Sequence, residues 1–319
     1  MSEEPAPTTP MGEAGARPSQ RTWPTWVSMF LILPLGSITF SVVALLLGAL
    51  VCGADLTDQG GMEKWIGEIS SSPAGILILI APGQLFLLAL SVGVAVPSPD
   101  PLSKRLGLVR PRISPRTLVL LCLGTPVVQL VSLLFASIFF DLNEPSEHME
   151  MLGGLFTGQE GVVGVSLLIL FAAVMPGLTE ELFFRGYVRV GLERRFGFAV
   201  AIFVPALIFA FIHGDPMHAT AVLPLGLWFG CLAWWSRSVI PSIIAHFVNN
   251  LFAIFSARYA TALEEGGVDL EPAADAAAGP LSEITILATA GYAGCFLMLV
   301  AGAFCLSQER RSERVSSDS

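Results

Sequence analysis

The chain has 319 residues, of which 53% are hydrophobic and 13% are charged, and its formal net charge is −9. This balance excludes an ordinary soluble domain, and the acidic charge gives no indication of a nucleic-acid partner. Several apolar runs reach the roughly 20 residues that a helix needs to cross the hydrocarbon core of a bilayer. The expected fold class is therefore all-α, a polytopic transmembrane helix bundle.

The apolar runs set the expected order of the chain. Residues 1–22 are rich in Pro, Ala, Glu and Thr without apolar periodicity, which predicts a disordered cytosolic tail. The run from Trp26 to Cys52 is too long for a signal peptide and should stay as the first span. About eight spans are expected, at 26–52, 73–97, 117–140, 161–183, 198–213, 222–235, 239–256 and 284–306. The predicted organisation begins with an N-terminal group of spans at 23–158, which includes a basic cytosolic loop at 98–116. A catalytic membrane core follows at 159–256. The chain then continues with an acidic outer loop at 257–283 and a final span with a cytosolic tail at 284–319.

The basic residues orient this bundle. If the N-terminus is cytosolic, 15 of the 17 Lys and Arg residues fall on the cytosolic side, and only Lys64 and Arg258 fall outside. An excess of positive charge on one side is typical of cytosolic loops in membrane proteins. The pattern predicts an integral multi-pass protein of the plasma or inner membrane, with both termini cytosolic.

One polar stretch, Thr-Glu-Glu-Leu-Phe-Phe-Arg-Gly at 179–186, lies inside an apolar span. Ionisable residues at membrane depth are costly, and they usually face a cavity, pair with one another and serve a function. Glu181 and Arg185 are four residues apart with the acid first, the favourable order for an ion pair on a helix. Glu180 then lies on a neighbouring face and is available for chemistry.

Two histidines are expected to reach the level of these glutamates. The spans on either side of Phe196-Gly197 should form an antiparallel hairpin, with Glu180 and His213 each about 16 residues from the turn. A rise of roughly 1.5 Å per residue places both about 24 Å from the turn. The basic residues from Arg189 to Arg195 indicate that the end of this hairpin projects into the cytosol, and Glu180 is only about 13 Å from Arg189. His246 follows the tight turn at Arg237 by nine residues, again about 13 Å, and so reaches the same depth, nearer the cytosolic side. The sequence therefore predicts a site that opens toward the cytosol.

The local spacing adds two expectations. Asn250 follows His246 by four residues, so the two side chains share one face of the helix. Pro176-Gly177 is expected to break the helix, with Thr179 as a new N-cap that lets water approach Glu180. A carboxylate in a partly dry cavity can act as a general base for water, a neighbouring His can share the proton, and a second His with an Asn can stabilise an oxyanion. Together these groups would hydrolyse an amide.

The same residue types leave a metal site open. Glu180, His213 and His246 could hold a divalent metal such as zinc through carboxylate oxygen and imidazole nitrogen. There is no His-Glu-x-x-His helix, so a zincin is not indicated. His148 and His218 fall in predicted outer loops and are assigned no role.

The three motifs resemble the signature of the CPBP family, which comprises intramembrane CAAX-processing endopeptidases and bacteriocin-processing or self-immunity proteins. The matching residues are Glu180-Glu181-Leu-Phe-Phe-Arg185, then Phe209-Ala-Phe-Ile-His213, then His246-Phe-Val-Asn-Asn250, within a similarity that spans roughly 160–255. The resemblance implies an endopeptidase in which Glu180 activates water assisted by His213.

For the remaining motif residues, the resemblance implies an oxyanion site made by His246 and Asn250 and a frame held by Glu181 and Arg185. It implies glutamate-dependent chemistry that requires no metal, and a membrane-anchored protein or peptide substrate of the CAAX type, cut near its C-terminus or close to the membrane. The sequence keeps two alternatives open: a proton- or ion-coupled transporter, and a non-catalytic immunity or scaffold protein. It leaves open the oligomeric state and whether the substrate is prenylated.

Overall fold

The structure is a computed structural model, and the prediction of an all-α fold is confirmed. It describes residues 23–54, 59–265 and 283–318, and in these ranges the chain is helical without a strand. The first half contains α1 (Trp23–Val27), η1 (Ser28–Ile32), α2 (Leu33–Cys52), α3 (Gln59–Ser70), α4 (Pro73–Gly75), η2 (Ile76–Ile80), α5 (Ala81–Ala95), α6 (Leu102–Arg105), α7 (Pro115–Leu123), α8 (Thr125–Ala136) and α9 (Glu147–Thr157), where η denotes a π-helix. The second half contains α10 (Gly161–Leu168), η3 (Ile169–Val174), α11 (Met175–Glu181), η4 (Leu182–Val188), α12 (Arg189–Phe211), α13 (Pro216–Ser236), α14 (Ile240–Glu265) and α15 (Glu283–Asp318).

Seven helical stretches of the described chain are long and apolar enough to cross a membrane. They are Pro24–Cys52, Pro73–Ala95, Pro115–Ala136, Gly161–Phe211, Pro216–Ser236, Ile240–Leu263 and Ala290–Arg314. Each overlaps a span expected from the sequence, and Gly161–Phe211 covers two of them. The predicted tail at 1–22 lies outside the described residues, as does most of the predicted loop at 257–283, whose first residues continue α14 as a helix.

The 51-residue stretch from Gly161 to Phe211 is a hairpin that reverses at Gly197. Gly197 has φ 77° and ψ −178°, a conformation open to glycine but unfavourable for residues with a Cβ. The chain then returns, so that the rings of Phe184 and Phe209 meet edge to face with centroids 5.5 Å apart. The predicted turn near Phe196-Gly197 is therefore confirmed.

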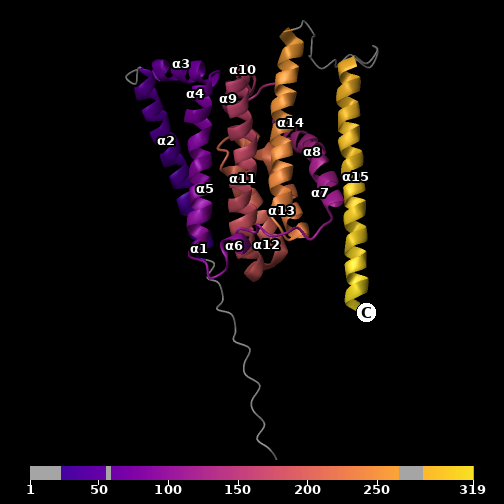
Figure 1. The fold of residues 1–319 in the computed structure, drawn as a ribbon. Coiled ribbons are helices and arrows are strands. Elements are labelled where there is room, and N and C mark those ends of the chain that lie inside the picture. Colours follow the sequence, from indigo (N-terminus) through magenta and orange to yellow (C-terminus); the bar gives the residue numbers. More distant parts are fainter. Residues whose placement is uncertain (1–22, 55–58, 266–282, 319) are drawn as a thin grey trace, which may run out of the picture.

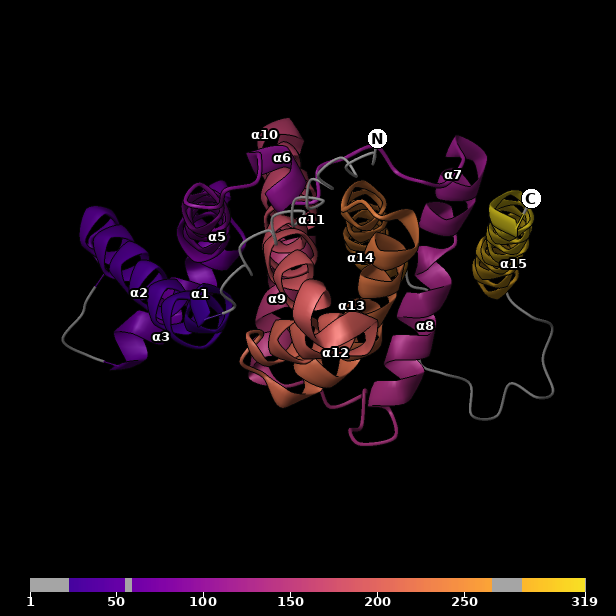
Figure 2. The same ribbon diagram turned by 90° about the horizontal axis from the view of Figure 1, so that it is seen from below.

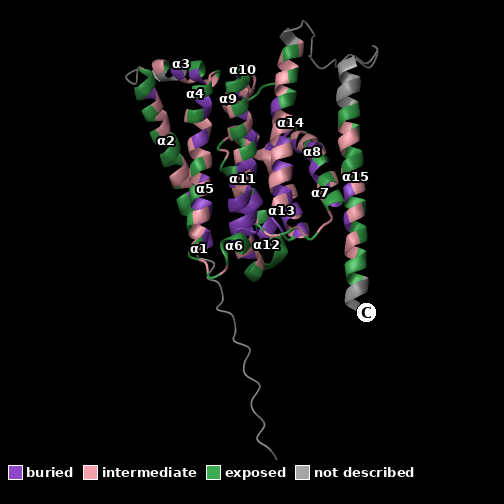
Figure 3. Cartoon of the chain, viewed as in Figure 1, coloured by how far each residue is buried: buried purple, intermediate pink, exposed green. Residues whose placement is uncertain are grey.

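The helices form a central group with two flanks (Figures 1 and 2). On one side α2 and α5 pack together, and α5 contacts α11 and η4 of the centre; on the other side α7 and α8 contact α13 and α14, and α15 packs on α7 and α8. Buried residues concentrate in the centre (Figure 3). Only 6% of the apolar window of the first candidate span and 11% of the last are buried, against 33% to 39% in the others. The apolar outer faces of α2 and α15 therefore suit contact with lipid.

The basic residues predicted on one side of the membrane meet at one end of the bundle. Arg237, at the turn between α13 and α14, pairs with Glu193 at 2.5 Å, and Arg194 pairs with Asp100 at 2.9 Å. At the other end, Arg258 donates to the carbonyl oxygens that close α9. The spatial grouping read from the sequence is thus found.

The expected helix break at Pro176 is wrong. The chain passes through η3, α11 and η4 as one continuous run of helix, with a π-helical segment on each side of α11. Proline removes one backbone N–H, and wide π-turns of this kind redistribute the hydrogen bonds around such a position without breaking the helix. Thr179 does not cap a helix but donates its hydroxyl to Gln84.

Candidate active site

Glu181 is the buried ionic anchor of the site. Its side chain is 0% exposed, and its Oε1 accepts a hydrogen bond from Arg185 Nη1 at 2.7 Å. The same oxygen lies 3.0 Å from His246 Nδ1. The predicted Glu181–Arg185 pair is confirmed, and it gives each buried charge the partner that it needs away from water.

Arg185 joins three elements around this anchor. Its Nη2 donates to the carbonyl oxygen of Gly226 on α13 at 2.8 Å. The guanidinium carbon lies 4.6 Å from the ring centre of Phe209 and 5.5 Å from that of Phe229, within reach of cation–π attraction. A Cβ on Gly226 would lie 3.3 Å from Nη2, so the absence of a side chain there permits this close approach.

His246 is held between the two glutamates. Its ring stacks on Phe229 with centroids 4.8 Å apart and planes 14° apart, while Nδ1 faces Glu181. This leaves Nε2 directed toward Glu180, at 3.9 Å from Oε2. That distance is too long for a direct hydrogen bond and matches two groups that share one water molecule.

Glu180 differs from its neighbour in its partners. Its side chain is 12% exposed, and Oε1 accepts a hydrogen bond from the amide of Gln84 on α5 at 3.0 Å. Its hydrogen-bond donor is thus a neutral amide, whereas that of Glu181 is a guanidinium. The two adjacent carboxylates have separate environments: one is locked in an ion pair and the other is accessible for proton transfer.

His213 lies in the turn after α12, two residues beyond the end of that helix at Phe211. Its Nδ1 is 2.7 Å from the carbonyl oxygen of Phe209. Because a carbonyl only accepts, Nδ1 carries the hydrogen and Nε2 of the neutral ring is an acceptor. The rings of His213 and His246 both meet that of Phe209, with centroids 5.0 and 6.0 Å away, which places His213 in the region of the site.

His148 and His218 lie in helices α9 and α13, so the prediction that they fall in loops is wrong, whereas their lack of a role stays a prediction. His148 Nε2 lies 3.1 Å from His218 Nδ1, and the rings of His218 and His213 are 4.4 Å apart. His148, His218 and His213 therefore form a row of contacts. The sequence did not reveal this because helix α9, which brings His148 back to α13, falls in a segment read as a loop.

Asn250 lies one turn beyond His246 and ties α14 to η3. Its Nδ2 donates to the carbonyl oxygen of Ala172 at 3.1 Å. That carbonyl is four residues before Pro176, which has no N–H to offer it. Asn249 donates to Oδ1 of Asn250. One N–H of the Asn250 amide is left for a ligand, and its place in an oxyanion site stays a prediction.

No three His, Cys, Asp or Glu side chains of the described chain converge closely enough to hold a metal ion. This applies to Glu180, His213 and His246, the set considered from the sequence. Chemistry without a metal stays a prediction, and the steps proposed below use side chains and water.

Comparison with known families adds one match. Residues 162–252 match the family model of the Rce1-like type II CAAX prenyl endopeptidases. This segment is similar to an Rce1-like endopeptidase and is called the Rce1-like domain below. It contains all six candidate residues, from Glu180 to Asn250, and confirms the resemblance to the CAAX-processing proteases. Together with the apolar helices, the Rce1-like domain supports an integral membrane protease. No match was found among curated proteins or among solved structures.

Gln84 is the site residue that sequence reasoning missed, and it lies outside the Rce1-like domain. The available signal was a single amide in the otherwise apolar sequence of α5. Its partner could not be read from that sequence, because contact with Glu180 depends on how α5 packs against α11.

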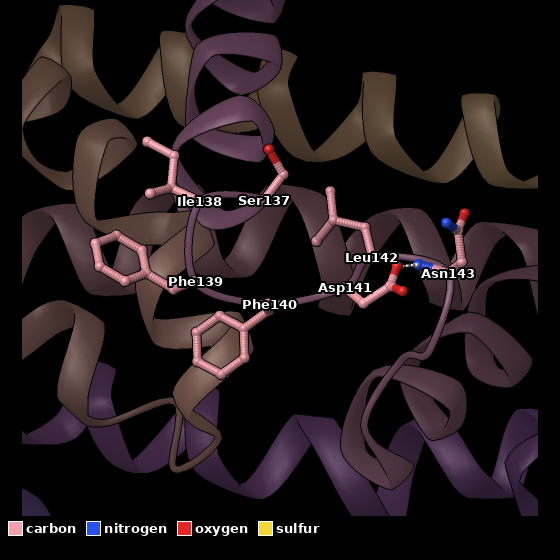
Figure 4. A pocket seen from close by; sticks show the side chains of 7 residues that line it. All are labelled: Ser137, Ile138, Phe139, Phe140, Asp141, Leu142 and Asn143. Atoms are coloured by element: carbon pink, nitrogen blue, oxygen red, sulfur yellow. Dashed lines mark hydrogen bonds between the residues drawn. The ribbon is translucent and has the colours of Figure 1, made fainter. Parts of the chain in front are cut away.

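A surface pocket is lined by residues that precede the Rce1-like domain in the sequence, in the turn that follows α8 (Figure 4). Asp141 Oδ1 accepts the backbone N–H of Asn143 at 2.9 Å there, which closes the turn on itself. None of the candidate site residues lines this pocket, whose lining consists of Ser137, Ile138, Phe139, Phe140, Asp141, Leu142 and Asn143.

Proposed function

We propose that this protein is an intramembrane endopeptidase in which Glu180 activates water. The observation that carries the proposal is the position of the Glu180 carboxylate, fixed through Oε1 and presenting Oε2 to His246 at 3.9 Å. A water molecule between these two groups would be held by the general base and by an imidazole that can donate to the reacting carbonyl.

The reaction follows from the groups around this position. Glu180 takes a proton from water, the resulting hydroxide attacks the peptide carbonyl carbon, and the C–N bond breaks as Glu180 returns the proton to the leaving amine. The products are a carboxylate and an amine. The acceptor Nε2 of His213 can hold a hydrogen of the same water and so orient it.

The oxyanion that forms on the carbonyl needs donors. With Nδ1–H directed to Glu181, His246 donates from Nε2 when both ring nitrogens carry hydrogen. The remaining N–H of Asn250 is the second donor that we propose. Loss of a single oxyanion donor in other enzymes slows turnover by about 100- to 1,000-fold. His246→Ala and Asn250→Ala should therefore lower kcat far more than they raise KM.

We propose that the substrate is a membrane-anchored, CAAX-type protein or peptide, cut near its C-terminus or close to the membrane. The supporting observation is the depth of Glu180 inside an apolar helix, which only a membrane-associated chain reaches readily. We place the basic end of the bundle in the cytosol and the protein in the plasma or inner membrane. Arg185, Tyr187 and Arg189 are buried between Glu180 and that basic end, so substrate would approach from the side and not along η4.

The test compares wild type with Glu180→Gln, which keeps the shape of the side chain and removes the base. The matched control is Glu160→Gln, at the start of α10, where the side chain makes no capping hydrogen bond. The variants are compared at equal expression by mapping the C-termini of membrane proteins, and after purification on prenylated and unprenylated peptides. Loss of the base should slow cleavage by at least about 100-fold. Cleavage that survives Glu180→Gln, or that is absent from wild type, would overturn the proposal.

A transporter and a non-catalytic immunity protein are not favoured, because the segment that holds every candidate residue is an endopeptidase-type domain.

A further inference from the structure

We propose that Gln84 of α5 is a positioning residue for Glu180: its amide fixes the direction in which the reactive carboxylate oxygen points. The proposal rests on the proposed role of Glu180 as general base. It adds a residue from outside the Rce1-like domain to the machinery of the site.

The geometry is a short chain of hydrogen bonds between α5 and α11. The hydroxyl of Thr179, which is fully buried, donates to Gln84 Oε1. The amide nitrogen of the same Gln84 then donates to Glu180 Oε1 at 3.0 Å. One amide thus bridges two consecutive residues of α11, and each of its ends has a complementary partner.

This arrangement determines which way the amide faces. Thr179 can rotate its hydroxyl to donate or accept, but the ionised carboxylate of Glu180 can only accept. A flipped amide would direct its oxygen at the carboxylate and lose the hydrogen bond to it. Donation from Thr179 to Gln84 Oε1 therefore stabilises the orientation that holds Glu180.

The other charged neighbours of Glu180 do not replace this contact. Arg185 is engaged with Glu181 and Gly226, and His246 Nε2 is 3.9 Å from the opposite carboxylate oxygen. His213 gives its Nδ1–H to a backbone carbonyl. Gln84 is therefore the group that keeps Oε1 occupied and leaves Oε2 facing His246.

Gln84→Leu removes the donor and preserves most of the side-chain volume. The expected result is a kcat lowered by about 10- to 100-fold with little change in KM, since the general base is misdirected while substrate contacts remain. The acidic limb of the kcat–pH profile should also move to higher pH by about one unit, because a carboxylate without its donor holds its proton more tightly. Gln129→Leu is the matched control: it is the same change in another apolar span, α8, where the buried Gln129 Oε1 accepts no hydrogen bond from the described residues.

The hydroxyl gives a second test. Thr179→Val removes it with little change in shape, and the defect should resemble that of Gln84→Leu but be smaller. Thr179→Ser keeps a hydroxyl and should restore kcat. The double variant Gln84→Leu/Thr179→Val should be no worse than Gln84→Leu alone, because both changes act through one hydrogen-bond chain.

A spectroscopic readout separates this proposal from the proposed function. Infrared titration of the full-length protein in lipid follows the carboxyl band that Glu180→Gln removes. In Gln84→Leu the midpoint of that band should rise by about one pH unit, and in Gln129→Leu it should not move. This result supports the positioning role even if no peptide is cleaved, whereas missing Glu180-dependent cleavage counts against the proposed function alone. An unchanged midpoint in Gln84→Leu overturns the role of Gln84 whatever the enzyme activity.

Discussion

At the level of single residues, the two neighbouring carboxylates of the site differ in their partners and in the roles that we propose for them. Glu181 is buried and paired with Arg185 and His246, while Glu180 keeps partial exposure and a neutral donor. Removing one partner of a buried ion pair leaves the other charge buried and unpaired. This loss of folding stability is far larger than the stability that the intact pair contributes. The consequence is that Glu181 and Arg185 matter first for folding.

Arg185→Leu should destabilise the protein by about 3–5 kcal/mol, because it leaves Glu181 as an unpaired buried charge. Equilibrium unfolding in mild detergent measures this change. The control is Lys64→Ala, which breaks an exposed i,i+4 pair with Glu68 and should cost at most about 1 kcal/mol. The double variant Glu181→Leu/Arg185→Leu should recover part of the loss. A single variant as stable as the control would show that the pair is not an anchor.

Gly186, the last residue of the motif, provides a second test at this scale. A Cβ built there would lie 2.4 Å from the carbonyl oxygen of Leu106, a backbone atom that cannot move without shifting its loop. Gly186→Ala should therefore destabilise the protein by about 1–3 kcal/mol. Gly153→Ala, in α9, meets nothing within 4 Å and should be neutral or stabilising. Equal thermal stability of the two variants would refute the packing argument.

At the same scale, the shared depth of two motif residues could be predicted from the sequence, because the rise of a helix fixes depth. Glu180 and His246 were expected at one level, and they lie 3.9 Å apart. The rise of a helix carries no information on which neighbouring helix presents a side chain at that level. That is why Gln84 could not be assigned to Glu180 from the sequence.

At the level of elements, two helix N-termini meet beside His213. Asp215 caps α13 by accepting the N–H of His218, and Ser146 caps α9 by accepting that of Met149. Burial alone would raise the pKa of the Asp215 carboxyl, but hydrogen bonds from His218 N–H and the Ser146 hydroxyl hold it below its usual value. The hydrogen bond between Ser146 and Asp215 thus joins the N-terminus of α9 to that of α13.

Asp215→Ala should lower stability at neutral pH by about 1 kcal/mol, the usual effect of losing an N-cap. Because the folded-state pKa of Asp215 is lowered, its contribution is present above the unfolded value and is lost as the pH falls below about 4. The difference in melting temperature between wild type and Asp215→Ala should therefore shrink in acid. Asp215→Asn, which keeps an oxygen for the cap, should remain close to wild type at neutral pH. A difference that grows in acid would contradict the assignment.

Element boundaries were less predictable than element existence. The apolar runs located the membrane helices, and Gly197 marked the hairpin, since their signals are local. Two features depend on tertiary contacts: α9 forms where a polar connector folds back onto α13 and α14, and the π-helical segments beside Pro176 keep a helix continuous where proline suggested a break.

For the whole molecule, charge and fold give the same division into two ends. Arg194, Arg237 and the basic loop at 98–116 meet at one end, and Arg258 binds α9 at the other. From the rule of cytosolic positive charge we propose that the first end faces the inside of the cell. This division depends on the reversal at Gly197, because without it the helix after Arg194 would continue away from the bundle and Phe209 would not meet Phe184.

Cysteine accessibility tests this arrangement in intact cells. In a background without the native cysteines, three exposed positions are changed one at a time: Glu160→Cys before α10, Arg195→Cys beside the Gly197 turn, and Ser312→Cys near the end of α15. A membrane-impermeant maleimide should label Glu160→Cys from outside, and the other two only after the membrane is opened. Labelling of Arg195→Cys from outside would place the hairpin turn on the wrong face. If only Ser312→Cys were labelled from outside, α15 would run in the opposite direction while the Rce1-like domain kept the proposed orientation. This is because α15 packs on α7 and α8 at the edge of the bundle and carries none of the candidate site residues.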